Sequence, residues 1–184
     1  MRVLKGFTAW FTGLPCSGKT TIADRVAEIL KRNGCRVERL DGDIVRKGLT
    51  SDLGFSKEDR DENINRVTLV AKLLTRNDVA VLATFVSPYR ERREKTRREI
   101  GNFVEIYTRC PTEVCMQRDD KGMYKKALAG EITNFTGVDD PYEEPESPEL
   151  VLNTDKEAVE ESVKRVLDKL VELGYVSGTE TGPR

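Results

Sequence analysis

Histidine is absent from this chain of 184 residues. Without an imidazole there is no histidine general base, no histidine-activated nucleophile and no histidine ligand for a metal. Any chemistry must therefore use carboxylates, lysine, arginine, hydroxyls, thiols and a hard cation. Phosphoryl transfer suits that set of groups, because positioning, cations and backbone amides stabilise its transition state.

Cysteine is scarce as well, with four residues and no CxxC pair. Because no histidine can complete a zinc site, we interpret Cys16, Cys35, Cys110 and Cys115 as reduced thiols that pack as small hydrophobic side chains. Long apolar runs are also missing, and the N-terminus lacks the pattern of a signal peptide. We therefore expect a cytoplasmic protein with no membrane partner.

The chain also has no strong charge of one sign. Its formal net charge is −1, so no global basic field attracts nucleic acid, and we expect no nucleic-acid partner. Hydrophobic residues make up 38% and charged residues 34%, which is typical of a globular protein. The length suits one domain, and we expect it to cover residues 1–176, followed by a disordered tail over residues 177–184.

Apolar runs alternate with segments of helical spacing along the chain. Predicted strands cover residues 7–12, 35–41, 79–86, 103–107 and 150–152. Predicted helices cover residues 19–33, 56–74, 89–100, 111–118 and 159–170. This order predicts an α/β fold, in which a parallel sheet of about five strands has helices on both faces and binds ligands at the carboxyl ends of its strands. Residues 120–147 do not fit the alternation, and we interpret them as a lid.

The loop after the first predicted strand has the pattern GxxxxGK[ST]. Its glycines let backbone N–H groups surround phosphate oxygens at the start of a helix, with Lys19 on the β- and γ-phosphates of ATP and Thr20 on Mg²⁺. A glycine-rich turn without a nucleotide is the alternative, but the position between a strand and a helix favours ATP. We expect the Cys16 side chain to point away from the phosphates. The predicted ATP-binding residues are Gly13, Leu14, Pro15, Cys16, Ser17, Gly18, Lys19, Thr20 and Thr21.

Two carboxylates follow the second predicted strand, in Asp41-Gly-Asp43. The carboxyl end of that strand should place them beside the phosphate loop. Two roles suit them, a hold on Mg²⁺ and a base for an acceptor hydroxyl. We assign the base to Asp43 and the metal to Thr20 and Asp41. The alternative is turn chemistry, in which Asp43 caps a short helix.

Four stretches of the chain resemble the adenylylsulfate kinase (APS kinase) family. They are GLPCSGKTT, LDGDIVRKGLTSDLGFSKEDRDENINRV, FVSPYRERR and DDKGMYKKALAGEITNFTGVDDPYEEPESPELVL, and the resemblance runs from about Lys5 to Tyr175. It implies a P-loop kinase that transfers the γ-phosphoryl group of ATP to the 3′-hydroxyl of adenosine 5′-phosphosulfate in sulfate activation, with Mg²⁺ as cofactor and a homodimeric assembly. This chain departs from the family at Ile44, where DGDN is usual, and at Pro15-Cys16, where Ser-Gly is common.

The resemblance also implies an acceptor site. Arg46, Arg60 and Asn63 would hold the phosphosulfate and ribose, and Phe55 and Phe135 would stack on the adenine. Ordinary core burial is the alternative for Phe55. The implied acceptor-binding residues are Asp41, Asp43, Arg46, Phe55, Arg60, Asn63, Val86, Ser87, Lys121, Asn134 and Phe135.

Ser87 aligns with a serine described in this family as a phosphoserine intermediate. Because no histidine can activate its hydroxyl and direct transfer needs no covalent step, we expect Ser87 to hydrogen-bond the acceptor. The predicted catalytic residues are thus Lys19, Asp43 and Ser87. The run RERREKTRREI is interpreted as a solvated helix face, with an anion site as the alternative and Arg90 as the arginine that would face a ligand.

Two other functions are compatible with a phosphate loop. One is another small-molecule kinase of the same fold, of nucleoside, nucleotide or shikimate type, which differs in its acceptor. The other is a nucleotide-dependent switch, whose slow turnover no small acceptor would stimulate. The acidic, arginine and aromatic residues around a second pocket argue against the switch.

Overall fold

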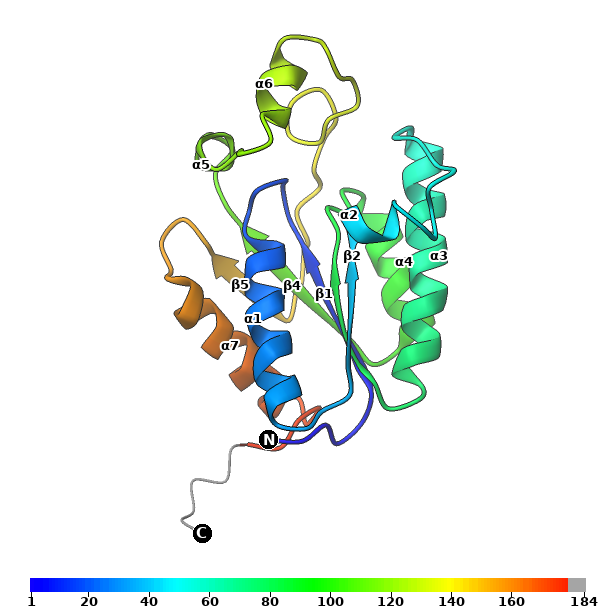
Figure 1. The fold of residues 1–184 in the computed structure, drawn as a ribbon, viewed down its shortest axis with the longest axis vertical. Helices are drawn as coiled ribbons and strands as arrows, with labels where there is room; N and C mark the ends of the chain where they lie inside the picture. Colours follow the sequence, from blue (N-terminus) through cyan, green and yellow to red (C-terminus); the bar gives the residue numbers. More distant parts are fainter. Residues whose placement is uncertain (179–184) are drawn as a thin grey trace.

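The computed structural model, described for residues 1–178, contains one five-stranded parallel sheet with helices on both faces (Figure 1). The strand order is β2-β3-β1-β4-β5, and every neighbouring pair is parallel. The predicted α/β fold is therefore confirmed. The strands are β1 (Phe7–Thr12), β2 (Val37–Asp41), β3 (Ala80–Thr84), β4 (Phe103–Arg109) and β5 (Leu150–Asn153).

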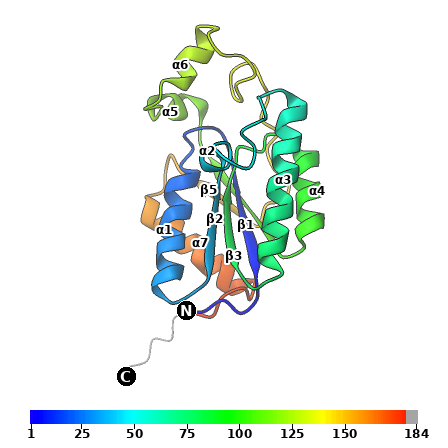
Figure 2. The ribbon, with the colours of Figure 1, turned by 45° about the vertical axis from the view of Figure 1, so that its right-hand side comes forward.

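Helices form a layer on each face of the sheet (Figures 1 and 2). One face is covered by α1 (Lys19–Arg32) and α7 (Val159–Glu172), and the other by α3 (Lys57–Thr75) and α4 (Arg90–Ile100). Three short helices lie near the carboxyl ends of the strands, where the phosphate loop also lies. They are α2 (Gly42–Val45), α5 (Thr112–Gln117) and α6 (Met123–Leu128).

The central strand β1 explains the two-sided core. All six of its residues are buried, because β3 and β4 flank it and helices cover both of its faces. Phe7, Ala9 and Phe11 point into the cluster under α1 and α7, whereas Trp10 points into the cluster under α3. This alternation is the period of two expected of a strand. Among residues 1–178 no helix combines the length and apolar character needed to cross a membrane.

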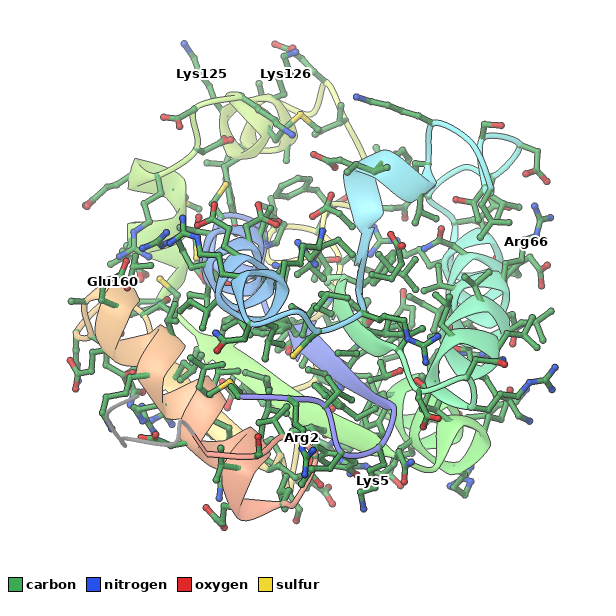
Figure 3. All side chains as sticks on the ribbon, turned by 60° about the horizontal axis from the view of Figure 1, so that its bottom comes forward. Arg2, Lys5, Arg66, Lys125, Lys126 and Glu160 are labelled. Carbon is green, nitrogen blue, oxygen red and sulfur yellow. The ribbon has the colours of Figure 1, made fainter. Side chains whose placement is uncertain are left out.

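Several predicted boundaries were too generous. The second strand begins at Val37 rather than at residue 35, and the third ends at Thr84 rather than at residue 86, because only Ala80–Thr84 pair with β1 and β2. The proposed lid is not wholly irregular, since it contains α6. That helix buries Tyr124 and directs Lys125 and Lys126 outward (Figure 3). The tail expected over residues 177–184 lies, from residue 179 on, outside the described residues.

The interpretation of α4 as a solvated face was wrong for part of the helix. Arg92, Arg93 and Thr96 are buried. Thr96 forms a hydroxyl pair of 3.0 Å with Thr68 of α3, and Arg93 pairs with Glu105 of β4 over 2.8 Å. The alternation of charges along α4 could not reveal this burial, because the residues that pair with Thr96 and Arg93 belong to α3 and β4. The four cysteines are free, as expected.

An ion pair beside β5 predicts acid sensitivity. Arg97 donates to both carboxylate oxygens of Glu149, at 2.5 and 2.9 Å, and the N–H of Glu105 donates at 2.6 Å. Burial by itself raises the pKa of Glu149, but these hydrogen bonds lower it overall. A lowered folded pKa stabilises the fold above the unfolded pKa, and this contribution is lost as the pH falls through the folded pKa.

Glu149→Gln is expected to lower the free energy of unfolding by about 1 kcal/mol at pH 7, with the difference from wild type shrinking as the pH falls below the ordinary glutamate range. Thermal unfolding midpoints measured from pH 3 to pH 7 check this. Glu94→Gln is the matched control, because the Glu94–Arg98 contact is an exposed pair at 3.9 Å. An equal difference at every pH would contradict the assigned pKa direction.

Candidate active site

The phosphate loop is held in shape by hydroxyl groups from neighbouring strands. Ser17 Oγ lies 2.8 Å from Thr108 Oγ1, and Thr154 Oγ1 donates to the carbonyl of Ser17 over 2.9 Å. Gly13 has a φ of 148°, and a Cβ there would lie 2.4 Å from Thr108 Oγ1, so the close packing requires glycine. The loop is therefore a rigid cradle rather than an ordinary turn.

Lys19 lies inside this cradle. Its Nζ donates to the carbonyls of Gly13 and Leu14, at 2.9 and 2.7 Å, and the side chain is buried. Burial lowers the pKa of Lys19 to about 8. An anion placed against this ammonium would stabilise its charged form.

Helix α1 begins with free N–H groups. Gly18 occupies the N-cap with a φ of 91°, makes no side-chain cap hydrogen bond, and is followed by a first turn without acidic residues. The unpaired amides and the helix dipole favour an anion at this point. The half-buried Cys16 lies in the same loop, and burial followed by the charge of Asp119 raises the pKa of its thiol. A raised thiol pKa makes Cys16 a weaker nucleophile at neutral pH.

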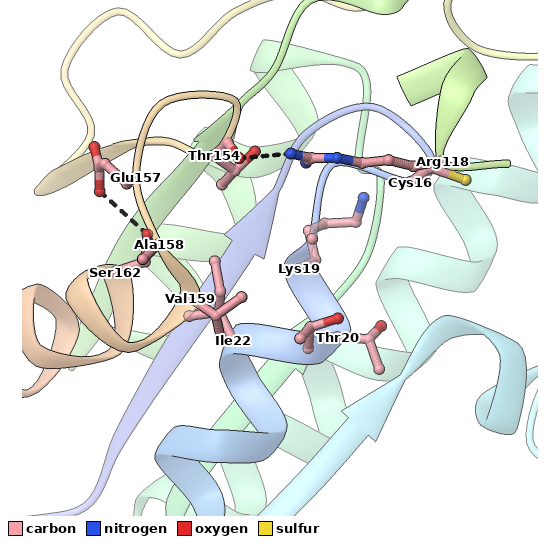
Figure 4. A pocket seen from close by; sticks show the side chains of 12 residues that line it. Cys16, Lys19, Thr20, Ile22, Arg118, Thr154, Glu157, Ala158, Val159 and Ser162 are labelled. Carbon is pink, nitrogen blue, oxygen red and sulfur yellow. Dashed lines mark hydrogen bonds between the residues drawn. The ribbon is translucent and has the colours of Figure 1, made fainter. Parts of the chain in front are cut away.

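A cavity of about 570 Å³ opens beside the start of α1. Figure 4 shows Lys19 and Thr20 at the start of α1 and the Arg118 side chain above Lys19, where Arg118 Nη2 donates to the carbonyl of Thr154 over 2.8 Å. Glu157 accepts from the hydroxyl of Ser162 over 3.1 Å. The cavity thus continues from the phosphate loop to the region between α5 and α7.

Asp41 ends β2 and lies against the phosphate loop. Its Oδ2 accepts hydrogen bonds from Thr20 Oγ1 at 2.9 Å and from Thr84 Oγ1 at 2.7 Å, and its Oδ1 accepts from the N–H of Asp43 at 3.0 Å. Burial raises the pKa of Asp41, but these hydrogen bonds lower it overall, so the carboxylate is charged. Asp41, and not Asp43, caps the short helix α2.

Asp43 is different, because 71% of its side chain is exposed and its carboxylate pairs with Lys121 of the proposed lid. The pair joins two predicted site residues from distant parts of the chain. The ion pair raises the pKa of Lys121. Apart from this ion pair the Asp43 carboxylate is exposed, and it is therefore accessible to a second substrate.

Arg46 and Phe55 form a stacked pair. The guanidinium carbon lies 4.2 Å from the ring centroid, and Nη1 donates to the carbonyl of Gly54 over 2.9 Å. Phe55 is 58% exposed, so the alternative of core burial does not apply to it. Its ring is available for stacking.

Arg60 connects α3 to the proposed lid. Its guanidinium donates to Thr136 Oγ1 at 2.6 Å, to Asp140 Oδ2 at 2.9 Å, and to the carbonyl of Asn134. Phe135 lies beside these groups, with its ring at 4.9 Å and 76° to Tyr124. The structure therefore brings predicted acceptor residues from α3 and from the lid together.

Three other predicted acceptor residues are less accessible to a ligand than Phe55. They are Asn63, Val86 and Ser87. Asn63 is 5% exposed, and its amide oxygen accepts from Thr50 over 2.7 Å. The carbonyl of Val86 accepts from the hydroxyl of Thr12 over 2.7 Å. Ser87 is buried with a φ of 43°, and its hydroxyl accepts from the indole N–H of Trp10 over 3.1 Å. Arg90 bonds to the carbonyl of Glu144 and to Glu146, rather than facing the phosphate loop.

Sequence reasoning missed the residues on the far side of the cavity. Arg118, Thr154 and Glu157 line it, yet none belongs to a motif with a chemical mechanism. Their positions along the chain were the one signal that could have found them. Arg118 is the C-cap residue of α5, and Thr154 and Glu157 follow β5, at the carboxyl edge of the sheet. It also missed the buried Arg93, because nothing in the run around it distinguishes that arginine from the others.

Comparisons with known proteins agree with this geometry. The family model described as adenylylsulphate kinase matches residues 5–153. The chain is 59% identical to an adenylyl-sulfate kinase of Halothermothrix orenii over 96% of both chains, and 58% identical to one of Picosynechococcus over 94% of this chain and 98% of that protein. It superposes on the Mycobacterium tuberculosis APS kinase CysC in complex with AMPPNP and APS with a TM-score of 0.86, at 43% identity, over 90% of this chain and 98% of that one. The chain therefore belongs to the adenylylsulphate kinase family, as its sequence motifs predicted.

Proposed function

We propose that this chain transfers the γ-phosphoryl group of ATP to the 3′-hydroxyl of adenosine 5′-phosphosulfate, giving ADP and 3′-phosphoadenylylsulfate. The observation that carries the proposal is the meeting of two sets of groups at one edge of the sheet. Lys19 and the open start of α1 suit a polyphosphate, and the exposed Asp43 beside them suits an acceptor hydroxyl. One P-loop domain over residues 1–176 is proposed to contain both sets.

The ATP side comprises the loop from Gly13 to Thr21 and the cavity of about 570 Å³ beside it. The loop amides and Lys19 would hold the phosphates, and the cavity between Arg118 and Glu157 would take the nucleoside. Lys19 and the loop amides would stabilise charge on the transferring phosphoryl group, and they are fixed in place before the reaction begins.

The residues at the phosphate loop fit a magnesium ion. Thr20 and Asp41 present a hydroxyl and a charged carboxylate 2.9 Å apart, and these hard oxygen donors suit Mg²⁺. Among residues 1–178, no group of three or more acidic, cysteine or histidine side chains could form a metal cage. Such a sparse set suits an ion held mainly by substrate phosphates and water. When bound there, Mg²⁺ would neutralise phosphate charge.

The acceptor side lies between α3 and the proposed lid. The face of Phe55 and the ring of Phe135 would stack on adenine, and the guanidinium groups of Arg46 and Arg60 would hold the phosphosulfate. Asn134 and Lys121 of the lid border the same space. The contacts that Arg60 makes to the lid support a role for this segment in excluding water, which would otherwise hydrolyse ATP.

Asp43 is proposed to orient and deprotonate the 3′-hydroxyl. Its carboxylate is exposed, in contrast to that of Asp41, whose oxygens accept three hydrogen bonds. Ser87 is proposed to act with Val86 at the acceptor hydroxyl rather than as a phosphorylated intermediate. The direction of its hydrogen bond supports this, because an oxygen that accepts from Trp10 keeps its own proton for donation.

Two further proposals come from the family resemblance and the composition. The chain is proposed to act as a homodimer, and to work in the cytoplasm. Light scattering coupled to size-exclusion chromatography decides the first, and a monomer at micromolar concentration would overturn it.

The reaction is tested by measuring ADP formation from ATP·Mg²⁺ without acceptor, and then with adenylylsulfate, AMP, adenosine or shikimate. Strong stimulation by adenylylsulfate alone is expected, with a new 3′-phosphate in the product. Stimulation by another acceptor would favour a different small-molecule kinase. Bound ATP with slow turnover that none of the acceptors stimulates would favour the nucleotide-dependent switch.

A further inference from the structure

One face of α4 contacts the end of the proposed lid through arginines. Arg90, Arg93 and Arg97 have the spacing i, i+3 and i+7, which places them on one side of a helix. The segment that they contact, residues 143–149, reads Glu-Glu-Pro-Glu-Ser-Pro-Glu, and we name it the return limb. Arg90 pairs with Glu146 of this limb at 2.6 Å. The charges of helix and limb are complementary, so the limb is fastened to the helix.

Arg93 is the buried member of this set. Its side chain is 1% exposed, and its guanidinium binds three separate segments. Nε donates to Glu105 of β4 at 2.8 Å, Nη1 donates to the carbonyl of Ser87 at 2.6 Å, and Nη2 donates to the carbonyl of Glu143 at 2.6 Å. One planar cation thus joins the sheet, the turn after β3 and the return limb.

The turn at Ser87 needs such support. Its φ of 43° lies in the left-handed region, which residues other than glycine adopt at an energetic cost and keep only when their surroundings hold them. The neighbouring carbonyl of Pro88 accepts from the N–H of Glu143 at 2.9 Å, so turn and limb are joined twice. On its other side, the turn is bonded to the indole of Trp10.

We propose that Arg93 is a positioning residue for the acceptor, which it serves by holding the Ser87 turn and the return limb in one fixed arrangement. The inference rests on the proposed function, in which Val86 and Ser87 meet the acceptor hydroxyl and the lid covers it. None of the hydrogen bonds of Arg93 goes to the phosphate loop, and Arg93 does not line the cavity beside α1. Its loss should therefore affect the acceptor and leave the ATP site unchanged.

Arg93→Lys is the variant that tests this role. Lysine keeps a positive charge opposite the buried Glu105, whereas Arg93→Met would leave that carboxylate with Arg97 alone, at 3.2 Å. A single ammonium cannot span three acceptors with the geometry of a guanidinium fork. Arg98→Lys is the matched control on the same helix, since Arg98 is exposed and makes only a 3.9 Å contact with Glu94.

Arg93→Lys is expected to raise the KM for adenylylsulfate about tenfold while the KM for ATP stays within about twofold. Amide hydrogen exchange in the return limb, residues 143–149, should become faster, and the emission of Trp10, the one tryptophan of the chain, should change. Arg98→Lys should match wild type in all three measurements. An unchanged KM for adenylylsulfate, or an equal rise in both KM values, would overturn the proposal.

Hydrogen exchange and fluorescence need no substrate, so they separate this inference from the proposed reaction. If wild-type protein fails to turn over adenylylsulfate, the proposed reaction is wrong, whereas exchange in residues 143–149 still reports whether Arg93 holds the return limb. Exchange and emission that are identical in Arg93→Lys and wild type would overturn the positioning role by themselves.

Discussion

Lys19→Ala is expected to lower kcat by a factor of roughly a hundred to a thousand, and to weaken ATP binding as well. The ammonium is fixed by the carbonyls of Gly13 and Leu14 at the place where the β- and γ-phosphates are proposed to lie. Positive charge there acts in a buried site, where it stabilises the transferring phosphoryl group more strongly than it would in water. Steady-state ADP formation and calorimetric titration with ATP measure the two effects.

The same substitution should not unfold the protein. Burial lowers the pKa of Lys19 to about 8, so the folded state disfavours the charged form and gains no net stability from the charge. A thermal unfolding midpoint near that of wild type is therefore expected alongside the loss of activity. Lys31→Ala, which removes an exposed lysine from the last turn of the same helix, is the control. Near-normal kcat in Lys19→Ala would contradict the assigned role.

Most of the fold could be predicted because local sequence and tertiary packing agree. Strands β1 and β3 are buried on both faces, and they are therefore mainly apolar in sequence, with threonine as their only polar residue type. Gly34, with a φ of 77°, follows α1 where the helical spacing ends. Strand ends were less well predicted, because Phe85 is apolar and buried yet lies past the last paired residue of β3.

A role at the site could be assigned from the residues only where a local motif has a known chemical function. The positions of the phosphate loop and of the carboxylates after β2 follow from backbone geometry and strand direction. Both of these can be predicted from the sequence. The cavity residue Arg118 and the buried Arg93 depend on which segments approach them in space. Glu105 and the carbonyl of Glu143 define the role of Arg93, and both follow it along the chain with no local signal.

The two carboxylates after β2 illustrate the same limit. The sequence predicted both at the site and left open whether Asp43 acts as a base or caps the short helix. In the structure Asp41 accepts from the N–H of Asp43 and forms the cap, whereas Asp43 is exposed and meets Lys121. Only the spatial arrangement shows that Asp41 is held by hydrogen bonds beside Thr20, whereas Asp43 is exposed to a substrate.

Asp43→Ala is expected to lower kcat by about a hundredfold or more while the KM for ATP stays within about twofold. The reason is that Asp43 is proposed to act on the acceptor hydroxyl, whereas the groups that hold the nucleotide are Lys19, Thr20 and the loop amides. Rates with saturating adenylylsulfate, measured over a range of ATP concentrations, separate the two parameters. Turnover close to wild type would show that the base assignment is wrong.

The pairing of Asp43 with Lys121 offers a second explanation, in which Asp43→Ala acts by releasing the lid. Lys121→Ala removes the same ion pair and leaves the carboxylate in place, and the pair is exposed, so it should contribute only weakly to stability. If Asp43 is the base, Lys121→Ala retains most of the kcat and the double variant is no slower than Asp43→Ala. If the ion pair is what matters, both single variants lose activity equally. The base assignment therefore requires that the loss in Asp43→Ala be much larger than the loss in Lys121→Ala.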